Sequence, residues 1–261
     1  MENLDKEILP DIKNIKSQET YTLPSKGLVY DPTDNIPASI TLRRMTTKED
    51  KIRLRNESED RVRKDILQAC IVEDIDAGKL KLMDANLLLF RLRSISLLND
   101  KYKVYCRCPQ CRTEFIHEVN LNEVPVKFMD QNNLEKLHIK LPISENIIDL
   151  KYPSINDMIK MGDKIKDYAK NFPDADINEY IYFISGTLYL DKVNNTHLME
   201  EELDAYFNQL DILDNRAFRT AIQSLDDLFG FVDEIVGVCP MCRADVLHGL
   251  PITSELFTPS N

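Results

Sequence analysis

Two ten-residue stretches of this chain are near-copies of each other. The first runs Cys108-Pro109-Gln110-Cys111-Arg112-Thr113-Glu114-Phe115-Ile116-His117, and the second runs Cys239-Pro240-Met241-Cys242-Arg243-Ala244-Asp245-Val246-Leu247-His248. Each begins with a Cys-x-x-Cys turn, here called a knuckle, which places two thiolates on one side of a tight loop. One knuckle supplies half of a tetrahedral zinc site, so two supply all four ligands. The repeat therefore predicts that the chain closes on itself through a metal ion.

The predicted ligands are Cys108, Cys111, Cys239 and Cys242, and the predicted cofactor is a structural Zn²⁺. Four cysteines close the coordination shell, whereas a catalytic zinc keeps one position open for water. A redox or disulfide role is the alternative, but redox Cys-x-x-Cys motifs usually open a helix. Here the flanking residues have the pattern of strands, so each knuckle is expected at the end of a β-hairpin.

Other potential ligands lie close to the knuckles. Cys106 lies two residues before Cys108 and shares its strand face, so it could replace Cys108. Its counterpart in the second copy is Gly237, so a symmetric site does not use it. His117 and His248 each lie about 20 Å along an extended strand from their cysteine pair. That distance is too long for ligation, and we expect surface or hydrogen-bonded histidines.

Two arginines beside the knuckles and a further cysteine also need an interpretation. Arg112 and Arg243 each follow the second cysteine of a knuckle, where a guanidinium could offset the negative charge of four thiolates. The alternative for both is an exposed strand residue. Cys70 lies in an apolar helical stretch and is interpreted as a small buried hydrophobe.

The order of motifs repeats in the two parts of the chain. Each half runs as a strand, capped helices, a helix that begins at an aspartate, a strand, a knuckle and a second strand. We therefore predict an α+β fold of two related halves, joined by a two-knuckle zinc ribbon of β-hairpins. The predicted boundaries are an extended N-terminal arm (1–37), a first helical half (38–125) and a second helical half (126–261).

Short local signals define the repeat. The capping boxes are Thr46-Thr47-Lys48-Glu49 in the first half and Ser154-Ile155-Asn156-Asp157 in the second. Asp84 and Asp214 are expected to cap later helices, and the pair Leu23-Pro24 has its counterpart in Leu141-Pro142. The second half is longer, and we expect an additional helix that contains Leu198, Leu203, Tyr206 and Phe207.

Composition limits the functional class. The net charge is −11, which disfavours direct binding to nucleic acid, because such binding needs a basic surface. The basic run Arg53, Arg55, Arg61, Arg63 and Lys64 is interpreted as the solvated face of a helix. No apolar run approaches the roughly 20 residues that span a bilayer, and no secretory signal is recognised. We therefore expect no membrane partner and a location in a cytoplasm.

Catalytic motifs are absent from the sequence. It contains no G-x-S-x-G, P-loop, H-E-x-x-H or G-x-G-x-x-G motif. The chain has only four histidines and seven glycines. We therefore predict that it is not an enzyme and has no small-molecule substrate.

A series of short motifs recurs in the order of a known family. The motifs are Leu23-Pro24-Ser25-Lys26-Gly27-Leu28-Val29-Tyr30, Ile40-Thr41-Leu42-Arg43, Met45-Thr46-Thr47-Lys48-Glu49-Asp50, Ile66-Leu67, Cys70-Ile71, Asp84, Leu92-Arg93 and Cys108-Pro109-Gln110-Cys111. In this order they resemble the baseplate hub assembly proteins of T-even-like contractile-tail bacteriophages. The resemblance covers about residues 23–120 well, and the second half follows it more loosely, with the knuckle at Cys239 as its best anchor.

The resemblance implies a non-enzymatic structural or assembly protein of the phage tail baseplate. Its expected partners are other baseplate and tail proteins, and its expected location is the virion, with the host cytoplasm during assembly. The alternative function is a zinc-ribbon regulator that binds nucleic acid or the host transcription machinery. The acidic charge counts against direct DNA binding but not against protein partners.

Overall fold

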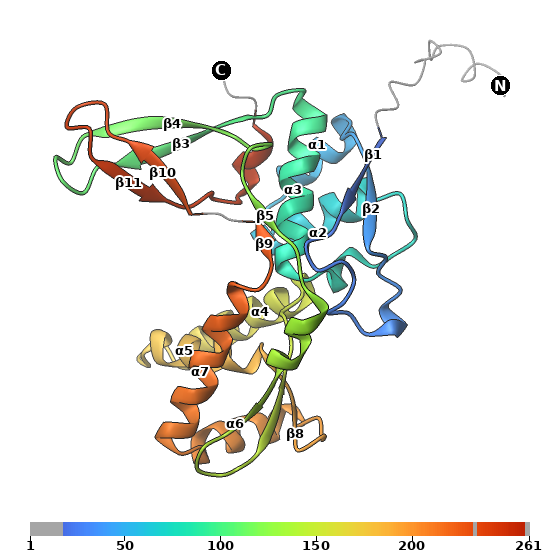
Figure 1. Cartoon of the computed structure of the whole chain (residues 1–261), viewed down its shortest axis with the longest axis vertical. Helices are drawn as coiled ribbons and strands as arrows, with labels where there is room; N and C mark the ends of the chain where they lie inside the picture. The colour runs from blue at the N-terminus through green and yellow to red at the C-terminus, as the bar shows by residue number, and fades with distance from the viewer. Residues whose placement is uncertain (1–17, 232–233, 259–261) are drawn as a thin grey trace.

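The structure, a computed structural model, describes residues 18–231 and 234–258 of the 261-residue chain. Two helical bodies are stacked along the long axis, and a lobe of two hairpins projects sideways from the upper body (Figure 1). All paired strands run antiparallel within the described ranges. The α+β class predicted from the sequence is confirmed.

The first body contains a two-stranded sheet and a group of helices. Residues Ile40 and Leu42 of the second strand point into the core, as the alternating pattern predicts. The elements are β1 (Gln18–Thr22), η1 (Pro32–Asp34), β2 (Ser39–Arg43), α1 (Thr47–Arg53), α2 (Glu59–Cys70), η2 (Ala77–Lys79) and α3 (Leu82–Leu97).

The second body repeats this order with additions. Its sheet has the strand order β6-β7-β8, and Ile148 and Leu150 of β7 are buried. The elements are η3 (Gln131–Leu137), β6 (His138–Lys140), β7 (Ile147–Leu150), α4 (Ile155–Asn171), α5 (Ile177–Thr187), β8 (Leu190–Val193), α6 (Glu200–Gln209) and α7 (Ile212–Asp226). Helix α6 is the additional helix, although Leu198 lies just before it.

The hairpin lobe combines segments that are distant in the sequence. Strand β3 (Lys101–Arg107) pairs with β4 (Glu114–Asn120), and β10 (Ile235–Val238) pairs with β11 (Asp245–His248). Below the lobe, β5 (Val126–Lys127) pairs with β9 (Gly230–Phe231), and a last turn, η4 (Ser254–Phe257), follows.

Two apolar cores lie behind these elements. The first contains the inner side chains of β2, α2, α3 and the first hairpin, and it also takes in Val246, Leu250 and Leu256 from the end of the chain. The second core contains the inner side chains of β7, β8 and α7, together with Met129, Leu141 and Phe229. Leu23 belongs to the first core, so residues 18–37 pack on the fold; the rest of the predicted arm, 1–17, lies outside the described residues.

Backbone hydrogen bonds join the two bodies directly. The amide of Leu82 donates to the carbonyl of Pro153 at 3.1 Å, and the amide of Ile155 donates to the carbonyl of Leu80 at 3.1 Å. Helices α2 and α4 also pack against each other. The contact between the bodies, here called the seam, therefore does not depend on the hairpins.

The helix caps include one prediction that is confirmed and one that is wrong. Both capping boxes form, at Thr46 and at Ser154. Asp84 and Asp214 are not N-caps, because the helices begin earlier, directly after Lys81 and Asp211. Each aspartate is instead buried in the first turn, where its carboxylate accepts a hydrogen bond from a backbone amide of another loop.

The described ranges 18–231 and 234–258 hold no helix that is long and apolar enough to cross a membrane.

Candidate metal centre

The two knuckles have the same backbone structure. The amide of Cys108 donates to the carbonyl of Thr113 at 2.9 Å, and the amide of Cys239 donates to the carbonyl of Ala244 at 2.9 Å. These bonds close each turn at the tip of its hairpin. The sequence repeat is thus a structural repeat, and each cysteine pair lies on one side of a tight turn.

The arginine after each knuckle occupies a left-handed conformation. Arg112 has φ 60° and Arg243 has φ 61°, and the amide of each donates to the carbonyl of the first cysteine, Cys108 or Cys239. Both side chains are exposed. Among the described residues, neither guanidinium donates a hydrogen bond to a cysteine sulfur, so their shared placement is explained by the turn.

The hairpins bring the four predicted ligand atoms together. The Sγ atoms of Cys108 and Cys242 are 3.6 Å apart, as are those of Cys111 and Cys239. All four sulfurs lie within 4.8 Å of one another. A tetrahedral ion with metal–sulfur bonds of about 2.3 Å requires sulfur–sulfur distances of about 3.8 Å. The cluster could therefore hold a metal ion with little rearrangement.

The electrostatics of the cluster favour a bound cation. The hydroxyl and amide of Thr113 lower the pKa of Cys111 to about 6. The amide of Ala244 lowers the pKa of Cys242, but burial and the neighbouring sulfurs outweigh it and raise that pKa to about 12. Four thiols at this distance cannot all ionise without a positive charge between them. A divalent ion would supply that charge and take up all four thiolates.

Cys106 and Cys70 lie apart from the cluster. Cys106 is buried on the inner face of β3, where its thiol contacts the carbonyl of Val104 at 3.7 Å. Cys70 is fully buried at the end of α2, and burial raises the pKa of its thiol to about 12. The structure thus places Cys106 on the face expected from the sequence but outside the group of four sulfurs.

The two histidines meet each other between the hairpins. Nδ1 of His117 lies 2.7 Å from Nε2 of His248, and the rings are nearly perpendicular. Gly237 lies against His117, since a Cβ added at this glycine would be 3.0 Å from Nδ1. The sequence predicted surface or hydrogen-bonded histidines, but not that each histidine is the other's partner. Their identical offset from the two knuckles was the available signal.

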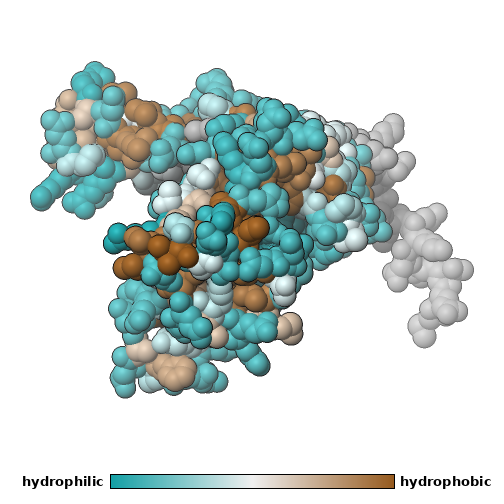
Figure 2. Space-filling view, turned by 60° about the horizontal axis from the view of Figure 1, so that its bottom comes forward, coloured by the Kyte–Doolittle hydropathy of each residue, from teal (hydrophilic) through white to brown (hydrophobic). Residues whose placement is uncertain are grey.

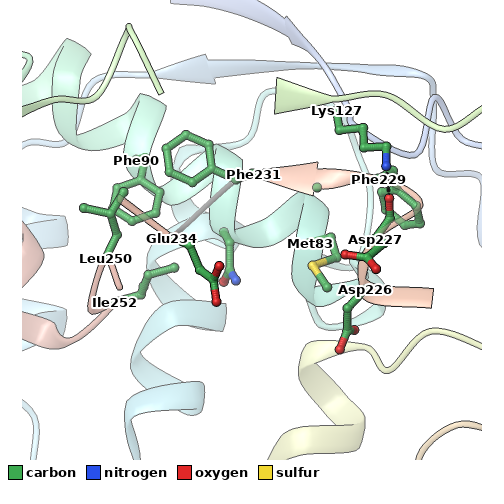
Figure 3. Close-up of a pocket in the computed structure, with 12 residues that line it drawn as sticks. Met83, Phe90, Lys127, Asp226, Asp227, Phe229, Phe231, Glu234, Leu250 and Ile252 are labelled. Atoms are coloured by element: carbon green, nitrogen blue, oxygen red, sulfur yellow. Dashed lines mark hydrogen bonds between the residues drawn. The ribbon is translucent and has the colours of Figure 1, made fainter. Parts of the chain in front are cut away.

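A separate cavity of about 560 Å³ lies below the lobe, where α3, β9 and the end of α7 converge (Figure 3). The phenyl rings of Phe90 and Phe231 stack on one side, with a centroid distance of 4.7 Å. Asp227, near the other end, accepts a hydrogen bond from Lys127 through its carbonyl oxygen. The described lining residues include no histidine, serine or cysteine, and the charged ones are Lys127, Asp226, Asp227 and Glu234.

The arginines of the basic run are neutralised by aspartates. Ion pairs join Arg53 to Asp50, Arg55 to Asp65, Arg61 to Asp163 and Arg63 to Asp60, with distances of 2.5–3.2 Å. Such surface pairs contribute little stability, but they remove the positive potential that a phosphate backbone needs.

Fold and site together define an α+β protein with two helical bodies and a four-cysteine cluster that could hold a metal ion. The sequence matches the model of a protein family described as T4 bacteriophage base plate protein over residues 16–251. Since that match spans most of the chain, the protein belongs to this family. Membership supports a structural protein of the phage baseplate that contacts other tail proteins. Searches of curated proteins and of solved structures returned no match.

Proposed function

We propose that this chain is a non-enzymatic structural or assembly protein of the baseplate hub, and that a structural Zn²⁺ ion holds its hairpin lobe together. The family match over residues 16–251 carries the functional part of this proposal. The role is to present a rigid surface to neighbouring tail proteins during baseplate assembly.

The convergence of Cys108, Cys111, Cys239 and Cys242 carries the metal part of the proposal. Four thiolates in a tetrahedron bind zinc or iron rather than magnesium or calcium, which prefer oxygen ligands. Zinc gives a colourless protein, whereas a ferric four-thiolate site absorbs visible light. Elemental analysis of the purified protein is expected to find about one zinc per chain, with no visible absorption band. Iron at that stoichiometry would refute the zinc assignment.

The location can be tested separately from the metal. Infected-cell lysate is fractionated on a density gradient, and the chain is followed by antibody in the free-protein, baseplate and whole-tail fractions. Presence in purified tails supports a virion component, and presence only on unfinished baseplates supports an assembly factor. A chain that appears only in the free-protein fraction throughout infection would contradict both.

The regulator alternative makes a different prediction. The arginine–aspartate pairs and the net charge of −11 leave little positive surface for nucleic acid. We therefore expect no salt-dependent binding to duplex or single-stranded DNA in a titration between about 50 and 200 mM salt. A steep salt slope would favour the regulator.

A further inference from the structure

The outer face of the second hairpin is apolar and exposed. Side chains alternate along β10 and β11, so Val236, Val238 and Leu247 point away from the first hairpin. Val236 and Leu247 lie opposite each other in the strand register. Their exposed fractions are 55% and 62%, that of Val238 is 52%, and Met241 in the knuckle reaches 73%. These four residues are here called the apolar face.

The first hairpin offers an internal comparison. It also has an exposed cross-strand apolar pair, Tyr105 and Ile116, at the places of Val236 and Leu247. The neighbouring pair differs: Arg107 lies opposite Glu114 in the first hairpin, where Val238 lies opposite Asp245 in the second. An ion pair between Lys101 and Glu118, at 2.6 Å, also covers the outer side of the first hairpin. The outer face of the first hairpin therefore carries more charged side chains beside its apolar pair than that of the second.

Figure 2 shows apolar side chains gathered on the lobe that projects from the molecule. Contiguous apolar patches of this kind on a soluble protein mark sites of protein contact. Asp245, an exposed carboxylate, lies opposite Val238 on this face, and the exposed Arg243 follows the knuckle. The chain as a whole carries a charge of −11. A partner that covers this face is therefore expected to present apolar side chains surrounded by basic residues.

We propose that the apolar face docks a neighbouring phage tail protein that presents an apolar stripe flanked by lysine or arginine. This proposal rests on the proposed function, because it takes its partner from the baseplate. A second copy of the chain is disfavoured, since it would carry the same acidic charge towards the interface. Because a stable interface buries about 800 Å² on each partner, the docked protein also contacts surface beyond these four side chains.

The test places a photo-crosslinker in the full-length protein during infection. The chain is supplied from a plasmid with p-benzoylphenylalanine at position 247, and the infected cells are irradiated. A matched control variant carries the same residue at position 116, the equivalent place on the first hairpin. Mass spectrometry then identifies what each position is bound to. We expect a crosslink from position 247 to a phage tail protein, at least fivefold stronger than any from position 116.

A charge variant supplies the second measurement. Val238→Lys and Leu247→Lys together place two cations on an exposed face, so the fold and the metal content should be unchanged. We expect at least tenfold less chain in the baseplate fraction, whereas Arg107→Ala with Glu114→Ala has no such effect. The result that overturns the proposal is a chain that still enters baseplates normally, or a crosslink to a second copy. A chain that never enters baseplates, even without substitution, would instead refute the proposed function.

Discussion

Asp214 occupies the same place in the second body that Asp84 occupies in the first. Each is the third residue of its helix and is fully buried. Oδ1 of Asp84 accepts a hydrogen bond from the amide of Ser25 at 2.9 Å, and Oδ1 of Asp214 accepts one from the amide of Ile143 at 2.7 Å. Each donor immediately follows a Leu-Pro pair. In each half, a buried carboxylate therefore joins the loop after the Leu-Pro pair to the helix that carries the aspartate.

The two aspartates should respond differently to amidation. Burial raises the pKa of Asp84, so its neutral form is tolerated, and one of its partners is the Tyr30 hydroxyl, which can also accept. Burial also acts on Asp214, but the amides of Ile143 and Ser144 outweigh it and lower its pKa. We expect Asp214→Asn to lower the melting temperature by about 4 °C or more and Asp84→Asn by clearly less. Equal losses in calorimetry would contradict this explanation.

The repeat was visible in the sequence because local signals carry it. Capping boxes, Leu-Pro pairs and knuckles each depend on a few adjacent residues, so Thr46 and Ser154 were placed correctly. The role of the aspartates was predicted wrongly. An aspartate near a helix start predicts a cap from local preference alone, whereas the partners of Asp84 and Asp214 lie more than 50 residues away. Only the folded chain shows that contact.

Loss of the metal should affect the lobe rather than the whole molecule. The seam joins the bodies through Leu82 and Ile155, so the hairpins are not their only connection. We expect Cys108→Ser and Cys242→Ser to reduce bound metal at least tenfold. Hydrogen exchange should then accelerate in 101–120 and 235–248, while α3 and α7 stay protected.

Cys106→Ser is the matched control for this experiment, since Cys106 is buried on β3, two residues before Cys108, but lies outside the cluster. It should leave the metal content unchanged. Loss of metal from this variant, or global unfolding of the Cys108→Ser variant, would show that the ligand set or the seam has been misjudged.

The four-cysteine cluster could be predicted from the sequence, but the exposed surface of the lobe around it could not. Each copy of the motif supplies two cysteines, and a tetrahedral metal site needs four ligands. The sequence therefore predicts that the two copies lie together in the fold. The exposed face of the second hairpin had no comparable signal. The pattern at Val236, Val238 and Leu247 indicates a strand, but it does not say which side of the strand is covered.

A partly buried ion pair in the first body predicts sensitivity to acid. The Arg43 guanidinium, 2.8 Å from Glu49, and then Thr46 hold the pKa of Glu49 at about 2. Because this pKa is lowered on folding from 4.5, the stabilisation is complete above pH 4.5 and is lost as the pH falls towards 2. Glu49→Gln should cost about 1–3 kcal/mol at pH 7 and flatten the pH dependence below 4.5. Urea titrations at pH 7, 4 and 3 measure both effects.

The histidine pair predicts a second, milder pH dependence, in the lobe. Burial, and then the charge of His248, lower the pKa of His117 below its ordinary value of 6.5. The folded lobe therefore binds fewer protons than the unfolded chain, so its stability is complete above pH 6.5 and declines as the pH falls below it. We expect the protection factors of the β10–β11 amides, which correct for the slower intrinsic exchange at lower pH, to fall as the pH drops from 7.5 to 6 with the metal still bound.

His117→Gln removes this titration and keeps a side chain that can hydrogen-bond, so the protection factors in this variant should depend less on pH over the same range. Gly237→Ala supplies an independent perturbation, because the added Cβ would press on the His117 ring at 3.0 Å. It should accelerate exchange in both hairpins at every pH. Metal content measured at each pH separates the histidine effect from release of the ion by protonated cysteines. If His117→Gln and the unmodified protein showed the same pH slope at full metal occupancy, the pair would be a packing contact without a role in the pH response.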